Sequence, residues 1–293
     1  MAEELPWNMQ VYKKSLSSTQ RLIPLLEHVV VQASIEHNAD RDTEHIHPSE
    51  MAKENWCTRQ TWYRITGEPE SDPDDYRLSR LNIFEEGNLV GEKWQRWMYE
   101  AGILVGMFKC LVCKHKWWAK SPALCPECES DLIKYAEVPL ADPDHWIIGH
   151  ADGLFEDEQG ECLEETKTVG MGTVRIDAPN LFLAYSNGNI SLDELWKRIK
   201  RPFSAHNKQL QIYMHCTGVH DGVVIYEWKP TQEVREFSVK YQPEIVAPLL
   251  KKCDEVIDAV ENEWQPKRHP NATSKSCQVC TYCPYKATCW SNK

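Results

Sequence analysis

The chain has 293 residues, enough to bury one sizeable core with appended modules or to form two domains, and it carries a net charge of −11. It contains no apolar run of about eighteen residues, and residues 1–10 lack the regions of a signal peptide, which excludes a membrane span and predicts a cytoplasmic protein. Twelve cysteines in such a protein argue against disulfides and for bound metal, and eight of them fall into two tight clusters.

The first third of the chain is predicted to be helical. Apolar residues recur at helical spacing over 22–35, 49–66 and 78–101, with polar loops between these stretches. The predicted buried stripe of the longest helix consists of Leu81, Phe84, Leu89, Trp94, Trp97 and Met98.

A cysteine module follows over residues 107–132. Its cysteines form two Cys-x-x-Cys knuckles at the spacing of a zinc ribbon, which predicts a structural Zn²⁺ held by Cys110, Cys113, Cys125 and Cys128. Lysines surround Trp117 and Trp118, and cations mixed with aromatic rings suit a single strand of nucleic acid. Alternatively, the two tryptophans pack the ribbon onto the core while the lysines solvate it.

The leading candidate site lies in a predicted hairpin. Two strand-like runs, 145–155 and 161–169, are joined by a short polar turn. Their register places Asp152 opposite Glu165, and Lys167 shares the face of Glu165 because side chains two apart lie on the same side of a strand. Two carboxylates and an ammonium would therefore converge. The alternative is a solvated hairpin face with an ordinary cross-strand ion pair.

The connection over 169–208 is long enough to act as a lid or a strand guide. The next predicted helix, 205–217, carries Gln209 and Tyr213 on one face. Basic residues gather at its entry, namely Lys197, Arg198, Lys200, Arg201, His206 and Lys208. Cations beside a polar pair suit a phosphate backbone, so the acidic net charge is only a weak argument against a DNA partner.

The last part of the chain reads as strands over 222–229 and 233–240, a helix over 245–263 and a cysteine-rich tail. The order of helices and strands predicts an α/β core with a mixed sheet. Gly170-Met171-Gly172-Thr173 lacks the lysine and the spacing of a phosphate-binding loop, so ATP is not an expected partner.

Three features in this order resemble the RecB-like branch of the PD-(D/E)XK nucleases: Asp152, Glu165-Thr166-Lys167 and Gln209-x-x-x-Tyr213. Residues 137–140, ahead of 147–152, resemble that branch's first core strands. The tail Cys280-x-x-Cys283-x5-Cys289, with the distant Cys57, is similar to its iron–sulfur subgroup, which includes CRISPR-associated RecB-like and phage recombination exonucleases.

The resemblance implies a restriction-endonuclease-like core, a mixed sheet flanked by helices. Its parts would be an N-terminal helical region with one cluster cysteine, the nuclease core, an inserted zinc ribbon and a C-terminal iron–sulfur clasp. These correspond to residues 1–76, 77–106 with 134–263, 107–133, and 264–293.

The resemblance also implies roles for single residues. Asp152, Glu165 and the backbone carbonyl of Thr166 would coordinate Mg²⁺ or Mn²⁺, ions that favour oxygen ligands. Lys167 would position the attacking water and help to deprotonate it. Gln209 and Tyr213 would orient the substrate strand or the Lys167 region. A [4Fe–4S] cluster would be ligated by Cys57, Cys280, Cys283 and Cys289.

The chain departs from the family pattern at Gly91, where the family often has a metal-binding histidine. Glu92, the next residue, is the favoured substitute, and His150, which the hairpin register places opposite Lys167, is the other candidate. Glu92 can equally face solvent and leave the metal with fewer protein ligands.

The cluster cysteines also admit alternatives. Cys277 with the three tail cysteines can form a local four-thiolate site, which closes only short loops, and Cys57 can be a buried structural cysteine. The context Trp56-Cys57-Thr58-Arg59 favours the long-range clasp.

The combined prediction is a Mg²⁺- or Mn²⁺-dependent deoxyribonuclease, an exonuclease by resemblance. It would act on DNA ends or single strands in recombination, repair or replication, and recombination or replication proteins are its expected partners. One alternative is a DNA-binding scaffold with the nuclease fold and little or no activity. The other is a zinc-ribbon transcription or replication factor, which explains only the ribbon.

Overall fold

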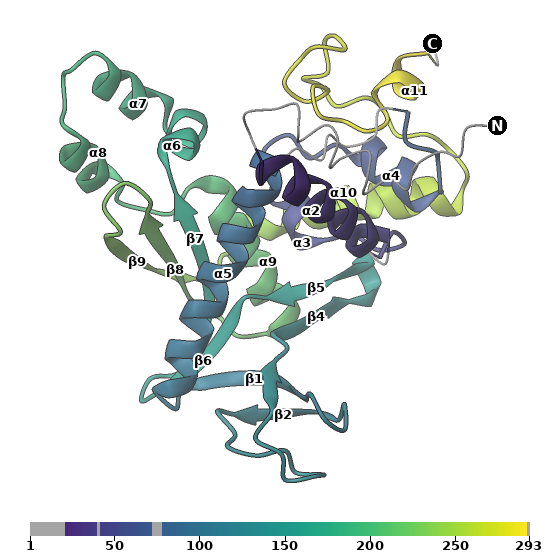
Figure 1. The fold of residues 1–293 in the computed structure, drawn as a ribbon. Helices are drawn as coiled ribbons and strands as arrows, with labels where there is room; N and C mark the ends of the chain where they lie inside the picture. The colour runs from purple at the N-terminus through teal and green to yellow at the C-terminus, as the bar shows by residue number, and fades with distance from the viewer. Residues whose placement is uncertain (1–20, 40–41, 72–77, 292–293) are drawn as a thin grey trace.

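The computed structural model describes residues 21–39, 42–71 and 78–291 (Figure 1). Residues 1–10, on which the signal-peptide prediction rests, lie outside these ranges, as do residues 72–76 at the end of the predicted N-terminal region. Within the three ranges, no helix combines the length and the apolar character needed to cross a membrane.

The centre of the fold is a seven-stranded mixed sheet. Its strand order is β2-β1-β6-β7-β8-β9, with β3 paired to β1. Strands β7 and β8 run parallel, and all other paired strands of this sheet run antiparallel. The sheet is therefore mixed, as predicted. The strands are β1 Leu104–Cys110, β2 Lys116–Lys120, β3 Ile133–Tyr135, β6 Gly153–Asp157, β7 Gly160–Val169, β8 Asp221–Trp228 and β9 Val234–Lys240.

A second, two-stranded sheet pairs β4 (Val138–Asp142) with β5 (Ile147–Ala151), joined by the short 3₁₀ helix η1 (Pro143–His145). The prediction of one continuous strand over 145–155 is therefore wrong. The chain bends at Asp152, so that β5 pairs with β4 while β6 pairs with β1 and β7. His150 accordingly lies opposite Pro139 and not opposite Lys167.

The described helices are α2 Ile23–Ala39, α3 Pro48–Met51, α4 Thr58–Ile65, α5 Leu78–Glu100, α6 Met171–Asp177, α7 Pro179–Ser186, α8 Leu192–Arg198, α9 Ser204–Thr217, α10 Pro243–Glu261 and α11 Lys286–Ser291. The helix expected over 49–66 is split into α3 and α4, and Cys57 is the N-cap of α4. Figure 1 shows β1 and β2 at the opposite end of the molecule from α6, α7 and α8, which occupy the predicted lid connection. The predicted ribbon boundary at residue 107 falls inside β1, whose first residues pair with β6.

Two glycines permit close packing on the sheet, one against α5 and one against α9. A Cβ atom at Gly153 would lie 3.1 Å from the Met98 methyl group of α5, and one at Gly222 would lie 2.5 Å from the Met214 methyl group of α9. A side chain at either position would therefore force the methionine methyl group to shift.

Only part of the predicted stripe of α5 is buried. Leu81 and Met98 are buried, but Phe84, Leu89 and Trp97 are 54%, 56% and 44% exposed. The prediction is wrong for these three, and part of the contact between α5 and the sheet is polar. Gln95 donates to the Asp152 carbonyl at 2.8 Å, and Lys93 and Trp94 both contact Glu227.

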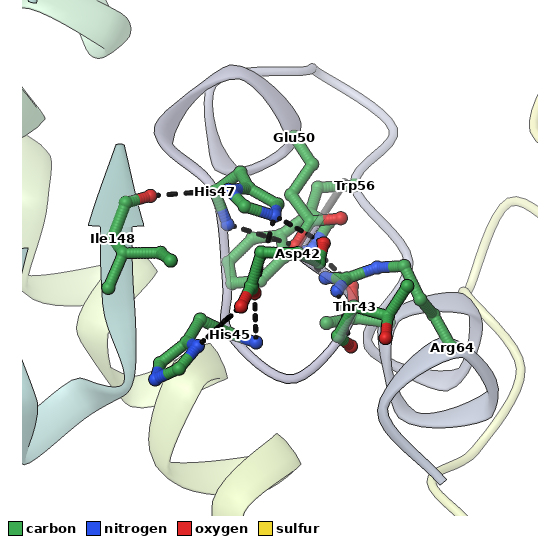
Figure 2. A network of polar contacts seen from close by, with 9 residues as sticks. Asp42, Thr43, His45, His47, Glu50, Trp56, Arg64 and Ile148 are labelled. Carbon is green, nitrogen blue, oxygen red and sulfur yellow. Dashed lines mark hydrogen bonds and ion pairs between the residues drawn. The ribbon is translucent and has the colours of Figure 1, made fainter. Parts of the chain in front are cut away.

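The segment before α3 is attached to β5 by backbone and side-chain contacts (Figure 2). Ile46 forms a parallel bridge with Ile147. The His47 ring lies between two carbonyl oxygens, 3.2 Å from that of Ile148 and 3.0 Å from that of Asp42. These contacts hold the region that contains α3 and α4 against the strand that leads to Asp152.

Candidate active site

The structure brings Asp152, Glu165 and Lys167 together. Glu165 and Lys167 are two residues apart in β7 and point to the same side of the sheet. The Lys167 ammonium forms an ion pair with the Glu165 carboxylate and lies 3.7 Å from Oδ2 of Asp152. The side chains of Asp152 and Lys167 are 30% and 27% exposed, so the site is open to solvent on one side.

Glu165 is the most buried group of the site. Its side chain is 0% exposed, and its polar partners are the Lys167 ammonium and the Tyr213 hydroxyl. Burial raises the pKa of Glu165 well above its ordinary value, Asp152 raises it further, and Lys167 opposes the rise. A buried carboxylate is costly unless cations or hydrogen-bond donors surround it.

Lys167 is held in its charged form by the two carboxylates. Burial lowers the pKa of Lys167, but Glu165 and Asp152 more than offset this, so the pKa lies above its ordinary value. In this state Nζ is a hydrogen-bond donor, able to orient a water molecule or a phosphate oxygen.

Gln209 and Tyr213 of α9 face the acidic site. The Gln209 amide donates to the Tyr213 hydroxyl. Burial raises the pKa of Tyr213 well above its ordinary value, and Glu165 and Asp152 add to this effect. Tyr213 therefore remains a neutral phenol beside the carboxylates.

The same face of α9 holds His206, which the sequence prediction placed among the cations. Burial lowers the pKa of His206 to about 3, and Lys167 contributes, so it is neutral and that prediction is wrong. The Phe203 N–H donates to the Tyr226 hydroxyl at 2.7 Å, and this hydroxyl donates to His206 Nδ1 at 2.6 Å. The spacing of His206, Gln209 and Tyr213 along a helix could have revealed their common face.

The rest of the predicted basic group is partly neutralised. Lys197 forms an ion pair with Asp193 at 2.6 Å, and Lys208 forms one with Glu54 at 3.0 Å. The entry of α9 is therefore less basic than the residue count indicates.

Two further acids near the site were missed by the sequence analysis. Glu164 points to the α5 side of β7, is 1% exposed and accepts a hydrogen bond from the Thr166 hydroxyl. Burial raises the pKa of Glu164 to about 8, and Asp152 adds to the rise. Burial and Asp152 likewise raise the pKa of Glu137 to about 7. Glu164 precedes the Glu-x-Lys pattern directly, but nothing in the sequence distinguishes it from a solvated glutamate.

The two predicted substitutes for the family histidine are not brought to the metal ligands. Glu92 is exposed and pairs with Lys134 at 3.2 Å, and His150 is exposed on β5. Across the described part of the chain, no third histidine, cysteine or acidic side chain joins Asp152 and Glu165 in a group of ligand atoms within 4.8 Å of one another. Space for a side chain at Gly91 is open, since a Cβ there would meet no atom within 4 Å.

The four ribbon cysteines lie together as the spacing predicts. Their sulfur atoms fall within 4.8 Å of one another, with Cys110 and Cys128 3.5 Å apart and Cys113 and Cys125 3.6 Å apart. Four thiols at this separation can surround one metal ion.

The C-terminal cysteines surround a cavity with Cys57. Cys57, Cys280, Cys283 and Cys289 all line one small pocket, whereas Cys277 does not line it. Arg59, Arg268 and Trp290 complete much of the wall, and the Trp290 indole lies at the Cys280 thiol. These four sulfurs do not form a group of ligand atoms within 4.8 Å of one another, so they are spread more widely than those of Cys110, Cys113, Cys125 and Cys128.

No protein-family model and no curated protein matches the chain. Among solved structures, that of the protein SSO0001 is similar at 13% identity, with 90% of this chain and 96% of that chain covered and a TM-score of 0.44. An alkaline exonuclease (LHK-Exo) from Laribacter hongkongensis is similar at 15% identity, with coverages of 78% and 93% and a TM-score of 0.43. The same exonuclease in complex with dAMP gives 13% identity, coverages of 75% and 90% and a TM-score of 0.40. Similarity at this level does not assign a family or an activity to the chain.

Proposed function

We propose that this protein is a metal-dependent nuclease that hydrolyses phosphodiester bonds at DNA ends or in single strands. The observation that supports the proposal most is the Glu165 carboxylate, which is fully buried beside Asp152 and Lys167. An ordinary surface ion pair would not require a fully buried carboxylate.

The donor set fits Mg²⁺ or Mn²⁺. Asp152 and Glu165 supply carboxylate oxygens and Thr166 supplies a backbone carbonyl, and hard divalent cations prefer oxygen ligands. When bound, such an ion stabilises negative charge on the phosphate and favours ionisation of water.

The chain's own residues would then position the substrate. Lys167 would donate hydrogen bonds to the attacking water or to a phosphate oxygen, and it can accept the water's proton only if its pKa falls from its present raised value. Tyr213 would donate its hydroxyl proton to an oxygen near Glu165, and Gln209 would hold that hydroxyl in place.

We further propose a structural Zn²⁺ in the ribbon and a [4Fe–4S] cluster in the cavity that contains Cys57. The spacing of the ribbon sulfurs suits one tetrahedral ion. The wider separation of these sulfurs suits a polynuclear group, and the indole N–H of Trp290 together with Arg59 and Arg268 would offset its thiolate charge.

Degradation of end-labelled single- and double-stranded linear DNA with Mg²⁺ or Mn²⁺, by protein purified without oxygen, tests the nuclease. Lys167→Ala should lower the cleavage rate by about 10²–10⁴-fold, the usual contribution of a positioned proton-transfer group. Lys240→Ala, at a surface lysine paired with Asp221, is the matched control and should cleave normally. Metal-independent cleavage, or equal rates for the wild type and Lys167→Ala, would contradict the proposal.

A second candidate function is a DNA-binding scaffold with little activity. The arrangement around Gly91 favours it, because Glu92 pairs with Lys134 and supplies no further ligand to Asp152 and Glu165. Cluster-loaded protein that binds DNA but cleaves none of the substrates with either ion would support this function.

A further inference from the structure

We propose a separate divalent-metal site, suited to Zn²⁺, formed by Asp142, His145 and His215. The three residues come from the end of β4, from η1 and from α9. Their nitrogen and oxygen ligand atoms all lie within 4.8 Å of one another. This site shares no residue with the proposed nuclease site, the ribbon or the C-terminal cavity, and it does not depend on the nuclease proposal.

The distances suit coordination of one ion. Oδ2 of Asp142 lies 2.7 Å from His145 Nδ1 and 3.0 Å from His215 Nε2. In a tetrahedral zinc site with bonds of about 2.0–2.1 Å, neighbouring ligand atoms are about 3.3 Å apart. Small side-chain rotations would therefore place one ion among the three atoms.

The other nitrogen of each imidazole meets an outer partner. His215 Nδ1 lies 3.2 Å from the Tyr241 hydroxyl, and His145 Nε2 lies 3.8 Å from Oδ1 of Asp254. Metal-binding histidines usually present one nitrogen to the ion while the other is held by a carboxylate, a carbonyl or water. Both rings thus have one nitrogen towards Asp142, and the His215 ring has its other nitrogen at hydrogen-bond distance from a hydroxyl.

Capping of η1 explains only part of this arrangement. As the N-cap residue, Asp142 uses Oδ1 to accept the His145 backbone N–H at 3.3 Å. This leaves Oδ2 directed at two imidazoles, one of which belongs to a helix more than seventy residues further along the chain. The three side chains are 13%, 23% and 26% exposed, which leaves an ion a path from solvent.

The ligand set is one carboxylate and two imidazoles, which suits zinc and similar transition ions and leaves a position for water. An ion here would join the β4–β5 hairpin to α9. Because β5 leads to Asp152 and α9 carries Tyr213, the proposed role is to fix the positions of these two elements.

The test is the zinc content of the purified full-length protein after dialysis against a zinc buffer. The wild type should retain about two zinc ions per chain, and Asp142→Asn and His215→Gln about one, since the ribbon keeps its own ion. His220→Gln is the control, because His220 is exposed and stacks on Tyr241 outside the three ligands. Equal zinc content in the wild type and both ligand variants would overturn the proposal.

X-ray absorption at the zinc edge tests the same site in the unaltered protein, so the result does not depend on the folding of a variant. Nitrogen and oxygen ligands in addition to sulfur are expected. A zinc sphere of sulfur alone would overturn the proposal.

Discussion

Glu164 and Glu165 are adjacent in β7, yet their carboxyl groups have different surroundings. Glu165 faces Lys167 and Asp152, whereas Glu164 faces α5 and is held by the Thr166 hydroxyl. Both are fully buried, and burial raises both pKa values. At the scale of residues, Asp152, Glu164 and Glu165 place more carboxyl groups at the site than Lys167 alone can neutralise. A bound cation would reduce the repulsion between them.

Glu164 should make the stability of the ion-free protein depend on pH. The ordinary pKa of 4.5 rises to about 8 on folding, so the folded state retains a proton that the unfolded chain releases. The stabilisation is complete below pH 4.5 and is lost as the pH rises through 8. Glu164→Gln should remove this dependence and be more stable than the wild type above pH 8.

Urea unfolding in a chelator across this pH range measures the effect. Glu158→Gln, at an exposed position in the β6–β7 turn, is the control and should follow the wild-type curve. If the Glu164→Gln and wild-type curves run parallel, the buried carboxylate is not the source of the pH dependence.

At the scale of elements, side chains alternate between the two sides of β2, so its two tryptophans can have different roles. One role is packing of the ribbon and the other is stacking on a base. Lys116, Trp118 and Lys120 share the exposed side of the strand. Trp117 points to the other side, where its ring stacks on His115 at 5.8 Å and lies 6.2 Å from that of Phe108. Trp117 thus packs the ribbon, while Trp118, 48% exposed between two lysines, is free to stack on a base.

Trp118→Ala should weaken the binding of single-stranded DNA by about tenfold, because one base–aromatic stack contributes about 1–3 kcal/mol. Zinc content should not change. Trp117→Ala should instead lower the stability of the ribbon. Fluorescence anisotropy with a labelled oligonucleotide measures the DNA affinity, and thermal unfolding measures the stability of each variant. Equal DNA affinity for Trp118→Ala and the wild type would rule out stacking at this position.

At the scale of the whole molecule, the region around α4 and the C-terminal tail are joined by contacts between distant parts of the chain. Arg59 donates to the Pro266 carbonyl, Gln265 donates to the Tyr63 hydroxyl at 2.7 Å, and Arg268 donates to the Cys289 carbonyl. In Figure 1 the yellow tail lies beside α4 accordingly. The cavity with its four cysteines lies within this junction, so a cluster there would connect the start of α4 to the C-terminal tail.

Cys57→Ser should lose the cluster, whereas Cys277→Ser should keep it, because Cys57 lines the cavity and Cys277 does not. Iron and acid-labile sulfide, measured in protein purified without oxygen, distinguish the two variants. Limited proteolysis should show earlier cleavage of the tail in Cys57→Ser. Retention of iron in Cys57→Ser together with its loss in Cys277→Ser would indicate a local site made by the four tail cysteines.

The sequence was sufficient for those features that depend on local spacing. Period-two alternation placed Glu165 and Lys167 on one face, and helical spacing placed Gln209 with Tyr213. The two Cys-x-x-Cys pairs predicted that their four cysteines lie together. Each of these relations is fixed within one element or one short loop, so few competing arrangements exist.

Tertiary structure alone decided the relations between elements. In the folded chain the predicted strand ends at Asp152, and burial keeps the His206 imidazole uncharged. Glu164 is buried, and Glu92 pairs with Lys134. Folding also brings His215 to Asp142 and Cys57 to the tail. Burial and long-range contact depend on which surfaces the packed sheet and helices present to one another, and residue spacing along the chain carries no information about that choice.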